Sequence, residues 1–546
     1  MAMEHATGAM MSVTESKELS HLGLVSAMFD ELRIGETIDG FIEQDFEQRN
    51  ISIGQATKAM VLNGLGFANQ RLYLFPEFFE GKPVEKFFCE GVTAADLNEH
   101  ACGRALDAIY EAGPTELYSV VAKAAVNQLG VIAKKVNIDT SSFHTDGAYD
   151  FEEEPGVIRI VQGYSRDHRP ELNQYGIELI TDNLTGIPVL MSALSGNDDD
   201  KTHFRSTIEN YGKQLQNDVG FEYLIGDSSL FVAQTIQSMQ GLTLWISRVP
   251  ETIASARDLI EVLADELAEE SNDGGLTHRS VGMTYAEVPQ HWLVVHSPQA
   301  RERASKSVGK QMRKLSDADQ KVFAKLCKQE FACEADALKA LELCKKQMKV
   351  SMIDDVCVEA SPRFNKRGRP AANAEPDFFC YQISASLASD HQLYEQRLRR
   401  KSCFILATNQ LDMTKLSADQ LLADYKSQQK VERGFRFLKD PLFLSSSVFL
   451  KSPKRIMALT MVMTICLLVY AALEQRIREG LKASKQLFPN QKGVWINRPT
   501  VRWIFQCFQN IQVIYFSGAS PIVLNLNERH SIILKLLGKP FGKVYS

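Results

Sequence analysis

Two acidic residues stand at positions where an α/β protein presents groups for chemistry. Asp139 ends the apolar stretch VNID and Asp227 ends the stretch LIGD, and small hydroxylated residues follow each of them. Ligands and catalytic groups of open α/β sheets gather at strand ends. An aspartate at a strand end is also common as a turn or helix-cap residue. Both interpretations therefore remain open from local sequence alone.

A third acid, Glu432, lies in a helix predicted over residues 417–439. Tyr425, Glu432 and Lys439 recur at intervals of seven, and Gln428 falls on nearly the same helix face. A carboxylate can bind a hard cation through its oxygens, whereas a phenol and an ammonium can reach phosphate oxygens. A helical Glu among basic neighbours is also common as a surface ion-pair partner. The combination on one face favours a metal site beside a phosphate backbone, and Arg433 and Arg436 flank it.

The elements that must position these residues follow from the hydrophobic pattern. Residues 1–130 show apolar residues at helical spacing, and strand-like segments begin at Leu129. Three strands (in VIAKKVNIDTSSF, VIRIVQGYS and IELITDNLTGIPVLMSAL) precede alternating helices and strands, which predicts an α/β fold with a mixed sheet. Charged helices then interrupt the pattern until the strand CFILATN.

This pattern predicts one α/β core that is interrupted by an insertion. The expected parts are a helical N-terminal domain, the first part of the core, the insertion domain, the last strand and helices of the core, and a C-terminal region. Their predicted bounds are 1–130, 131–250, 251–400, 401–480 and 481–546.

Composition limits the classes of function. The chain has 546 residues, of which 45% are hydrophobic, and 61 basic residues against 67 acidic residues give a net charge of −6. No general cationic surface is expected, so a nucleic acid would have to meet local patches. Two stretches supply them: residues 296–350 carry thirteen Lys/Arg against seven Asp/Glu, and residues 424–455 carry eight against three.

Cysteine usage and the N-terminus indicate a cytosolic protein. The ten cysteines form no CxxC pair and no Cys/His grouping at zinc spacing, so we expect reduced thiols and no structural zinc. Residues 1–20 contain no apolar run behind a basic start, which predicts no secretory signal.

One segment is apolar enough to raise the question of a membrane. Residues 456–473 are 18 uncharged and mostly apolar residues, near the lower limit for a membrane span. A central helix that is covered on all sides by a large domain has the same pattern. The segment is solitary, so we expect the buried helix and no membrane partner.

The helix motif resembles a known family. Tyr425, Gln428, Glu432 and Lys439 form Y-x2-Q-x3-E-x6-K, which is close to the Tyr-Arg-Glu-Lys signature of bacterial insertion-sequence transposases with an RNase H-like core and a DDE triad. The blocks NIDTSSFH, QGYSRDHRPELNQ, LIGDSSLF, LWISRVPET and ILATN are similar to the family's core blocks. The resemblance extends from about residue 50 to about residue 480. One departure is Gln428, which occupies the signature's Arg position.

The resemblance implies a triad of Asp139, Asp227 and Glu432 that holds two Mg²⁺ ions, with Mn²⁺ as a substitute. The implied activity is hydrolysis of a DNA phosphodiester, followed by joining of the freed 3′-hydroxyl to target DNA. Two ions about 3.5–4 Å apart can activate the attacking oxygen and stabilise the leaving one. The separation of Asp227 and Glu432 resembles the members that carry an insertion domain.

The implied partners are double-stranded DNA, as terminal inverted repeats and target, and further copies of the chain in a homodimer or higher assembly. The implied location is the cytoplasm of a bacterium, at the nucleoid. Three alternatives stay open: a DNA-binding relative that no longer cuts, an RNase H-fold nuclease or resolvase of another kind, and a membrane protein built around residues 456–473.

Several further residues are candidates for DNA contacts. Arg367 and Arg369 lie in RGRP, which can enter a narrow minor groove or remain a solvated loop. His168 and Arg169 either approach the scissile phosphate or order a turn between strands. Trp292 either stacks on an extruded base or is buried in an amphipathic strand.

Overall fold

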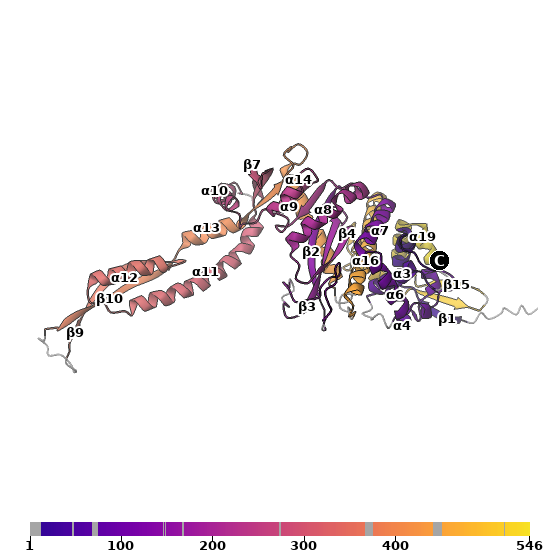
Figure 1. Ribbon diagram of the computed structural model, residues 1–546, viewed down its shortest axis with the longest axis horizontal. Helices are drawn as coiled ribbons and strands as arrows, with labels where there is room; N and C mark the ends of the chain where they lie inside the picture. Colours follow the sequence, from indigo (N-terminus) through magenta and orange to yellow (C-terminus); the bar gives the residue numbers. More distant parts are fainter. Residues whose placement is uncertain are drawn as a thin grey trace, which may run out of the picture. The chain divides into compact units, whose positions relative to one another are not determined.

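The structure is a computed structural model (Figure 1), and it describes residues 13–45, 49–67, 75–145, 147, 149–165, 169–271, 275–365, 375–440, 450–517 and 519–546. The chain divides into two compact units. Unit 1 comprises Met1–Ser247, Tyr285–Val288 and Asp412–Ser546, and unit 2 comprises Arg248–Thr284 and Pro289–Leu411.

The fold is mixed α/β, as the sequence predicted. The largest sheet has eight strands in the order β4-β3-β2-β5-β6-β11-β8-β7. Its strands are β2 (Lys135–Thr145), β3 (Asn173–Asp182), β4 (Pro188–Ser195), β5 (Tyr223–Gly226), β6 (Leu244–Arg248), β7 (Thr277–Tyr285), β8 (Val288–His296) and β11 (Cys403–Thr408). Strands β2, β3 and β4 are antiparallel, whereas β5 runs parallel to β2 and β6 runs parallel to β5. Three antiparallel strands followed by parallel ones are the arrangement expected of an RNase H-like core.

One expected strand does not form. The stretch VIRIVQGYS contributes a single bridge, between Val161 and Gln174, although Ile158 and Ile160 are buried. The apolar alternation of this segment therefore reflects packing against the sheet without a continuous ladder. This is the main departure of the core from the predicted order of strands.

Helices cover both faces of the core sheet in unit 1. Helix α8 (Asp200–Val219) packs on one face, where Thr207 Oγ1 donates to Glu178 Oε1 at 2.6 Å. Glu178 pairs with Thr140 across β3 and β2, so this face is opposite to the one that carries Asp139. Helices α14 (Ala418–Lys426) and α15 (Gln429–Leu438) lie on the Asp139 face. The short helix α9 (Ala233–Ser238) follows β5.

The helical part of unit 1 surrounds the apolar helix α16 (Pro453–Ser484). Its other helices are α1 (Leu22–Glu31), α2 (Ile34–Phe41), α3 (Ile53–Leu65), α4 (Phe75–Phe79), α5 (Val84–Phe87), the 3-10 helix η3 (Ala94–Asp96), α6 (Glu99–Glu111) and α7 (Pro114–Leu129). Helix α16 contacts α1, α3, α6 and α7, as Figure 1 shows for the last three. It is long and apolar enough to span a membrane, but 89% of its most apolar window is buried inside the protein. It is therefore the covered central helix that the sequence favoured.

The C-terminal residues pack against the N-terminal ones. Strand β14 (Gln512–Phe516) pairs with β1 (Val13–Glu18) and with β15 (Ala519–Leu524). Helix α19 (Lys539–Val544) contacts α1, and α18 (Glu528–Leu537) contacts α16. A small hairpin of β12 (Phe488–Pro489) and β13 (Trp495–Ile496) precedes α17 (Val501–Cys507). Residues 481–546 therefore join the helical N-terminal region in one body.

Unit 2 contains most of the predicted insertion. It contains β11, most of β7 and β8, and the helices α10 (Ala254–Glu270), α11 (Pro298–Cys327), α12 (Glu334–Gln347) and α13 (His391–Ser402). It also contains the two-stranded ribbon of β9 (Ser351–Arg363) and β10 (Phe378–Ser389). Helix α11 lies along α12, α13 and β10 (Figure 1). Its own small core includes Leu326, Phe331, Leu341, Ile353 and Ile383.

Candidate active site

One face of β2 carries a row of polar side chains. Residues 135, 137, 139, 141 and 143 alternate with the opposite face, so Lys135, Asn137 and Asp139 point the same way. Helices α14 and α15 lie along this row of side chains. Lys135 at its start forms an ion pair with Asp424 of α14, and at its end the Lys439 Nζ lies 5.4 Å from the centre of the Phe143 ring.

An open cavity of about 460 Å³ lies between β2 and α15. It is lined by Asp139, Thr140, Ser141, Glu432, Phe435, Arg436, Lys439 and Asp440. Asp139 is 8% exposed, and Glu432 is exposed. The fold thus brings two of the three predicted acids, which are distant in sequence, into one cavity together with two cations.

Asp227 ends the strand next to Asp139. The parallel register of β2 and β5 pairs Asn137 with Ile225, and Asp139 and Asp227 lie two residues further along their strands. The Asp227 Oδ1 accepts a hydrogen bond from the Ser229 N–H at 2.8 Å, which is the turn geometry weighed against a site role. Asp227 is half-buried and does not belong to the lining of the cavity.

The three acids do not form a compact metal-binding group in this structure. In the part of the chain that is described, no three His, Cys, Asp or Glu side chains are close enough together to hold an ion. Asp139 Oδ1 instead accepts a hydrogen bond from the Thr140 N–H at 2.8 Å. Carboxylates that converge without a cation repel one another, which favours separate local partners.

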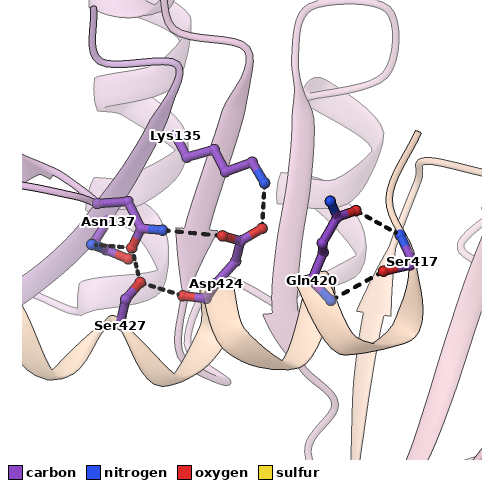
Figure 2. Close-up of polar contacts among 7 residues, drawn as sticks. Lys135, Asn137, Ser417, Gln420, Asp424 and Ser427 are labelled. Carbon is purple, nitrogen blue, oxygen red and sulfur yellow. Dashed lines mark hydrogen bonds and ion pairs between the residues drawn. The ribbon is translucent and has the colours of Figure 1, made fainter. Parts of the chain in front are cut away.

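The predicted helix over residues 417–439 is interrupted at Ser427 and Gln428. Helix α14 begins with a capping box of Ser417 and Gln420 (Figure 2) and ends at Lys426, and Gln428 is the N-cap of α15. The seven-residue spacing therefore does not run along one unbroken helix. Tyr425 and Gln428 are absent from the cavity lining, and Gln428 is 8% exposed. The structure groups Glu432, Arg436 and Lys439 of α15 without them.

The interruption coincides with a polar network that we name the α14 clamp, formed by Lys135, Asn137, Asn183, Asp424 and Ser427. Figure 2 labels all of them except Asn183. Asp424 pairs with Lys135, and Asn183 Nδ2 donates to Asp424 Oδ1 at 3.4 Å. Asn137 Nδ2 donates to Asn183 Oδ1 at 2.9 Å. The Ser427 hydroxyl donates to Asn183 Oδ1 and to the Asp424 carbonyl. The clamp joins the end of α14 to β2 and to the turn after β3.

Lys430 extends this attachment to the first turn of α15. Its Nζ donates to the carbonyls of Asn183, at 2.6 Å, and Leu184. Burial lowers the pKa of the Lys430 ammonium. The charge of Asp182 raises this pKa, whereas the charges of Arg433, Arg478 and Arg498 lower it.

The other residues that were predicted to contact DNA lie outside this cavity or outside the described residues. The Arg169 guanidinium donates to Glu171 in the segment before β3. Arg433 is exposed on α15. Trp292 on β8 is fully buried, and its Nε1 donates to Gln290 Oε1 at 2.8 Å. This is the buried strand position that the sequence offered as one of two readings of Trp292, and the other reading, stacking on an extruded base, does not fit its place in the fold. His168, Arg367 and Arg369 lie outside the described residues.

Sequence reasoning missed the residues that hold α14 and the residue after the motif. Asp424 directly precedes Tyr425, but its partners lie more than two hundred positions away, so no local pattern indicates the clamp. Asp440 lines the cavity and forms an ion pair with Arg502 of α17. The only available signal was the capping box S-x-x-Q at residues 417–420, which marks where α14 begins.

Comparison with known proteins gives the class. Residues 137–469, more than half of the chain, match the model of the family described as "Transposase DDE domain". The chain therefore belongs to the DDE transposase family. Residues 14–123 match a second family, described as "Domain of unknown function (DUF4277)". No curated protein matches the chain significantly in sequence.

Two solved transposase structures are similar to the chain at low identity. One is the "piggyBac transposase synaptic complex with hairpin DNA", with 8% identity over 83% of this chain and 66% of that one, and a TM-score of 0.31. The other is the "Mos1 transposase paired-end complex with left transposon end", with 10% identity over 42% and 66% and a TM-score of 0.15. The chain spans slightly less than two thirds of each.

Proposed function

We propose that this transposase cuts the ends of a DNA transposon by metal-dependent phosphodiester hydrolysis and joins the freed 3′-hydroxyl ends to target DNA. The observation that carries the proposal is the shared cavity of Asp139 and Glu432, with Asp227 at the end of the neighbouring strand. The proposed branch of the family is the one with the Tyr-Arg-Glu-Lys signature.

DDE transposases generally use divalent metal ions, and the donor chemistry here fits such an ion. Asp139, Asp227 and Glu432 supply only carboxylate oxygens, which suit Mg²⁺ or its substitute Mn²⁺. Bound between these residues, two such ions would activate the attacking oxygen and stabilise the leaving oxygen. We infer that the three carboxylates converge only with the cation, because their mutual repulsion opposes convergence without it.

The side chains of α15 supply the contacts to DNA. Arg436 and Lys439 line the cavity beside the carboxylates, where they would bind the oxygens of the phosphates that flank the scissile bond. An Arg guanidinium can bind a phosphate through two parallel hydrogen bonds, which fixes its orientation. Asp440 and Arg502 hold the end of α15 against α17, so the two cations project from an anchored segment.

The other parts of the chain have proposed roles in the DNA complex. The N-terminal helical domain would bind the terminal inverted repeats and aid their pairing. The insertion domain, with Arg367 and Arg369, would follow phosphates, and Arg169 and His168 would approach the cleaved strand. Two ends must be joined to one target, so we propose a homodimer or higher assembly on DNA, at the bacterial nucleoid in the cytoplasm.

The test is a cleavage and joining assay with DNA that carries the inverted repeats flanking the reading frame. We expect nicking at the repeat ends that depends on Mg²⁺ or Mn²⁺, followed by covalent joining to a target plasmid. Binding without nicking would identify a DNA-binding relative that no longer cuts. Nicking without joining would identify an RNase H-fold nuclease of another kind. Either result would overturn the proposal.

A further inference from the structure

The segment after α16 is strongly cationic in a chain that is acidic overall. Between Glu479 and Glu528 the sequence contains five basic residues and no acidic one. The basic residues are Lys482, Lys485, Lys492, Arg498 and Arg502. Such a local excess of positive charge suits an anionic partner.

The centre of this segment is the β12–β13 hairpin, whose turn is held by hydrogen bonds. Pro489 pairs with Trp495 across its strands. The Asn490 side chain accepts hydrogen bonds from the N–H groups of Lys492, at 2.9 Å, and Val494, at 3.0 Å. Gly493 has φ +77°, a conformation that favours glycine. The tip therefore has a defined conformation.

The hairpin is also anchored to the body of unit 1. Phe488 is fully buried, and the Trp503 Nε1 of α17 donates to the Pro489 carbonyl at 2.8 Å. The strand that carries Trp495 is thus attached to a buried base, while the tip projects. This arrangement presents the Trp495 side chain from a rigid support.

Trp495 is the exposed tryptophan of this chain. It is 57% exposed, as is its neighbour Val494, whereas Trp245 and Trp292 are fully buried and Trp503 is half-buried. Tryptophan is enriched at interfaces, because its ring combines a large apolar face with one polar N–H group. Its face is therefore available to another flat group.

Two cations flank Trp495 in the sequence, Lys492 three residues before it and Arg498 three residues after it. Lys492 and Arg498 are exposed, and neither forms an ion pair within the described residues. Trp503 of α17 holds the hairpin through the Pro489 carbonyl, and the neighbouring Arg502 forms an ion pair with Asp440, which lines the cavity. The hairpin and the cavity are therefore linked through α17.

We propose that the hairpin of residues 487–498 is a DNA contact in which Trp495 stacks on an unpaired base while Lys492 and Arg498 bind the adjoining phosphates. This inference rests on the proposed function, which places the cut DNA ends at the cavity beside α15. Aromatic stacking accepts any base and works best on unpaired ones, and cations nearby follow the backbone. A second copy of the same surface is a poorer partner, because like charges would face each other.

The test compares two DNA probes in the absence of divalent metal: a transposon-end duplex with three unpaired nucleotides at its 3′ end, and the same duplex fully paired. We expect the unpaired probe to quench tryptophan emission in the full chain, with most of the quenching lost in Trp495→Phe. Trp495→Ala should weaken binding of the unpaired probe about tenfold or more. It should change binding of the paired probe less than about threefold.

Charge variants complete the design. Arg498→Ala should weaken the binding of both probes. On the paired duplex it should also reduce the magnitude of the slope of log K against log salt by about 0.9. Lys213→Ala is the matched control, because Lys213 is an exposed cation of α8 on the opposite face of the sheet. It should leave both affinities unchanged.

Equal binding of both probes by Trp495→Ala and the wild-type chain, with quenching intact in Trp495→Phe, would overturn this inference. Conversion of a DNA-free oligomer to a smaller species by Trp495→Ala would also overturn it, because the ring would then belong to a contact between copies. Cleavage and joining by the wild-type chain are measured separately with Mg²⁺. Their absence would overturn the proposed function while the quenching result still decides the role of Trp495.

Discussion

The end of α14 and the face of α15 are consecutive in the chain but differ in how their charges are used. Asp424 and Ser427 are bound to β2 and to the turn after β3 through the α14 clamp. Glu432 and Arg436, five and nine residues after Ser427, face an open cavity. The first region satisfies its polar groups within the protein, and the second presents them outward.

The difference separates positioning from chemistry. A charge that is paired inside the fold contributes to the placement of a helix, whereas a charge directed into a cavity is available for a ligand. The interruption at Ser427 and Gln428 is the boundary between the two regions. Substitutions on either side of that boundary should therefore have different consequences.

The largest effect is expected at the carboxylates. Asp139→Asn, Asp227→Asn and Glu432→Gln should each reduce cleavage and joining below detection, because each removes a proposed ligand of the catalytic ions. Binding to end DNA should stay within about threefold of wild type, since the cations of α15 remain. Gel-shift and cleavage assays on the same DNA measure both. Near wild-type cleavage by one variant in Mg²⁺ would remove that residue from the site.

The second effect concerns the clamp. Asp424→Ala would leave the Lys135 ammonium and the Asn183 amide without their partner, at a cost of about 1–3 kcal/mol in the free energy of unfolding. The cleavage rate should fall about a hundredfold, because small misplacements of catalytic groups have effects of that size. The concentration of Mg²⁺ needed for half-maximal rate should change little.

The matched control for the clamp is Lys426→Ala. Lys426 is exposed in the last turn of α14, so its removal should affect neither stability nor rate strongly. Asp424→Asn should recover part of the lost rate, since an amide can still accept hydrogen bonds from Asn183 and Lys135. If Asp424→Ala lost stability but cleaved like wild type, the clamp would be structural without a positioning role.

The contrast also shows what the sequence could reveal. The hydrophobic pattern predicted the mixed sheet, because strand and helix periodicity is local. The acids at strand ends and the motif on residues 425–439 indicated the family. The clamp was out of reach, because Asp424 meets Lys135 only after β2 and α14 have packed together. The interruption at Ser427 was missed for a related reason: its hydroxyl bonds to Asn183, which is also distant in sequence.

Trp292 and Trp495 show the same limit. Each is the single tryptophan of its strand, and sequence reasoning considered only Trp292 for DNA contact. The pairing of β8 with β11 buries Trp292, while the short hairpin of β12 and β13 leaves Trp495 exposed. Exposure depends on how many neighbours a strand acquires in the fold, and a strand's own residues do not specify that number.

A smaller effect is expected at Lys439, the last cavity cation of α15. Lys439→Ala should weaken binding to end DNA by about three- to tenfold and reduce the salt dependence by roughly one phosphate contact. Residual cleavage should keep its normal Mg²⁺ requirement, because the carboxylates are intact. Titrations at several salt concentrations measure the slope. Assembly on DNA like that of wild type would show that this part of the cavity does not meet the backbone.

The smallest effect on DNA is expected at Gln428, where the family signature has Arg. From the sequence, Gln428→Arg should tighten end binding if a phosphate lies within reach. Gln428 is buried at the boundary between α14 and α15 and does not line the cavity. A guanidinium there would have to be desolvated or displaced, so we expect a loss of about 1–2 kcal/mol in unfolding free energy. Affinity for end DNA should stay within about twofold. Tighter binding with unchanged stability would instead place this position beside the DNA. The residues that contact DNA would then begin before α15, at the end of α14.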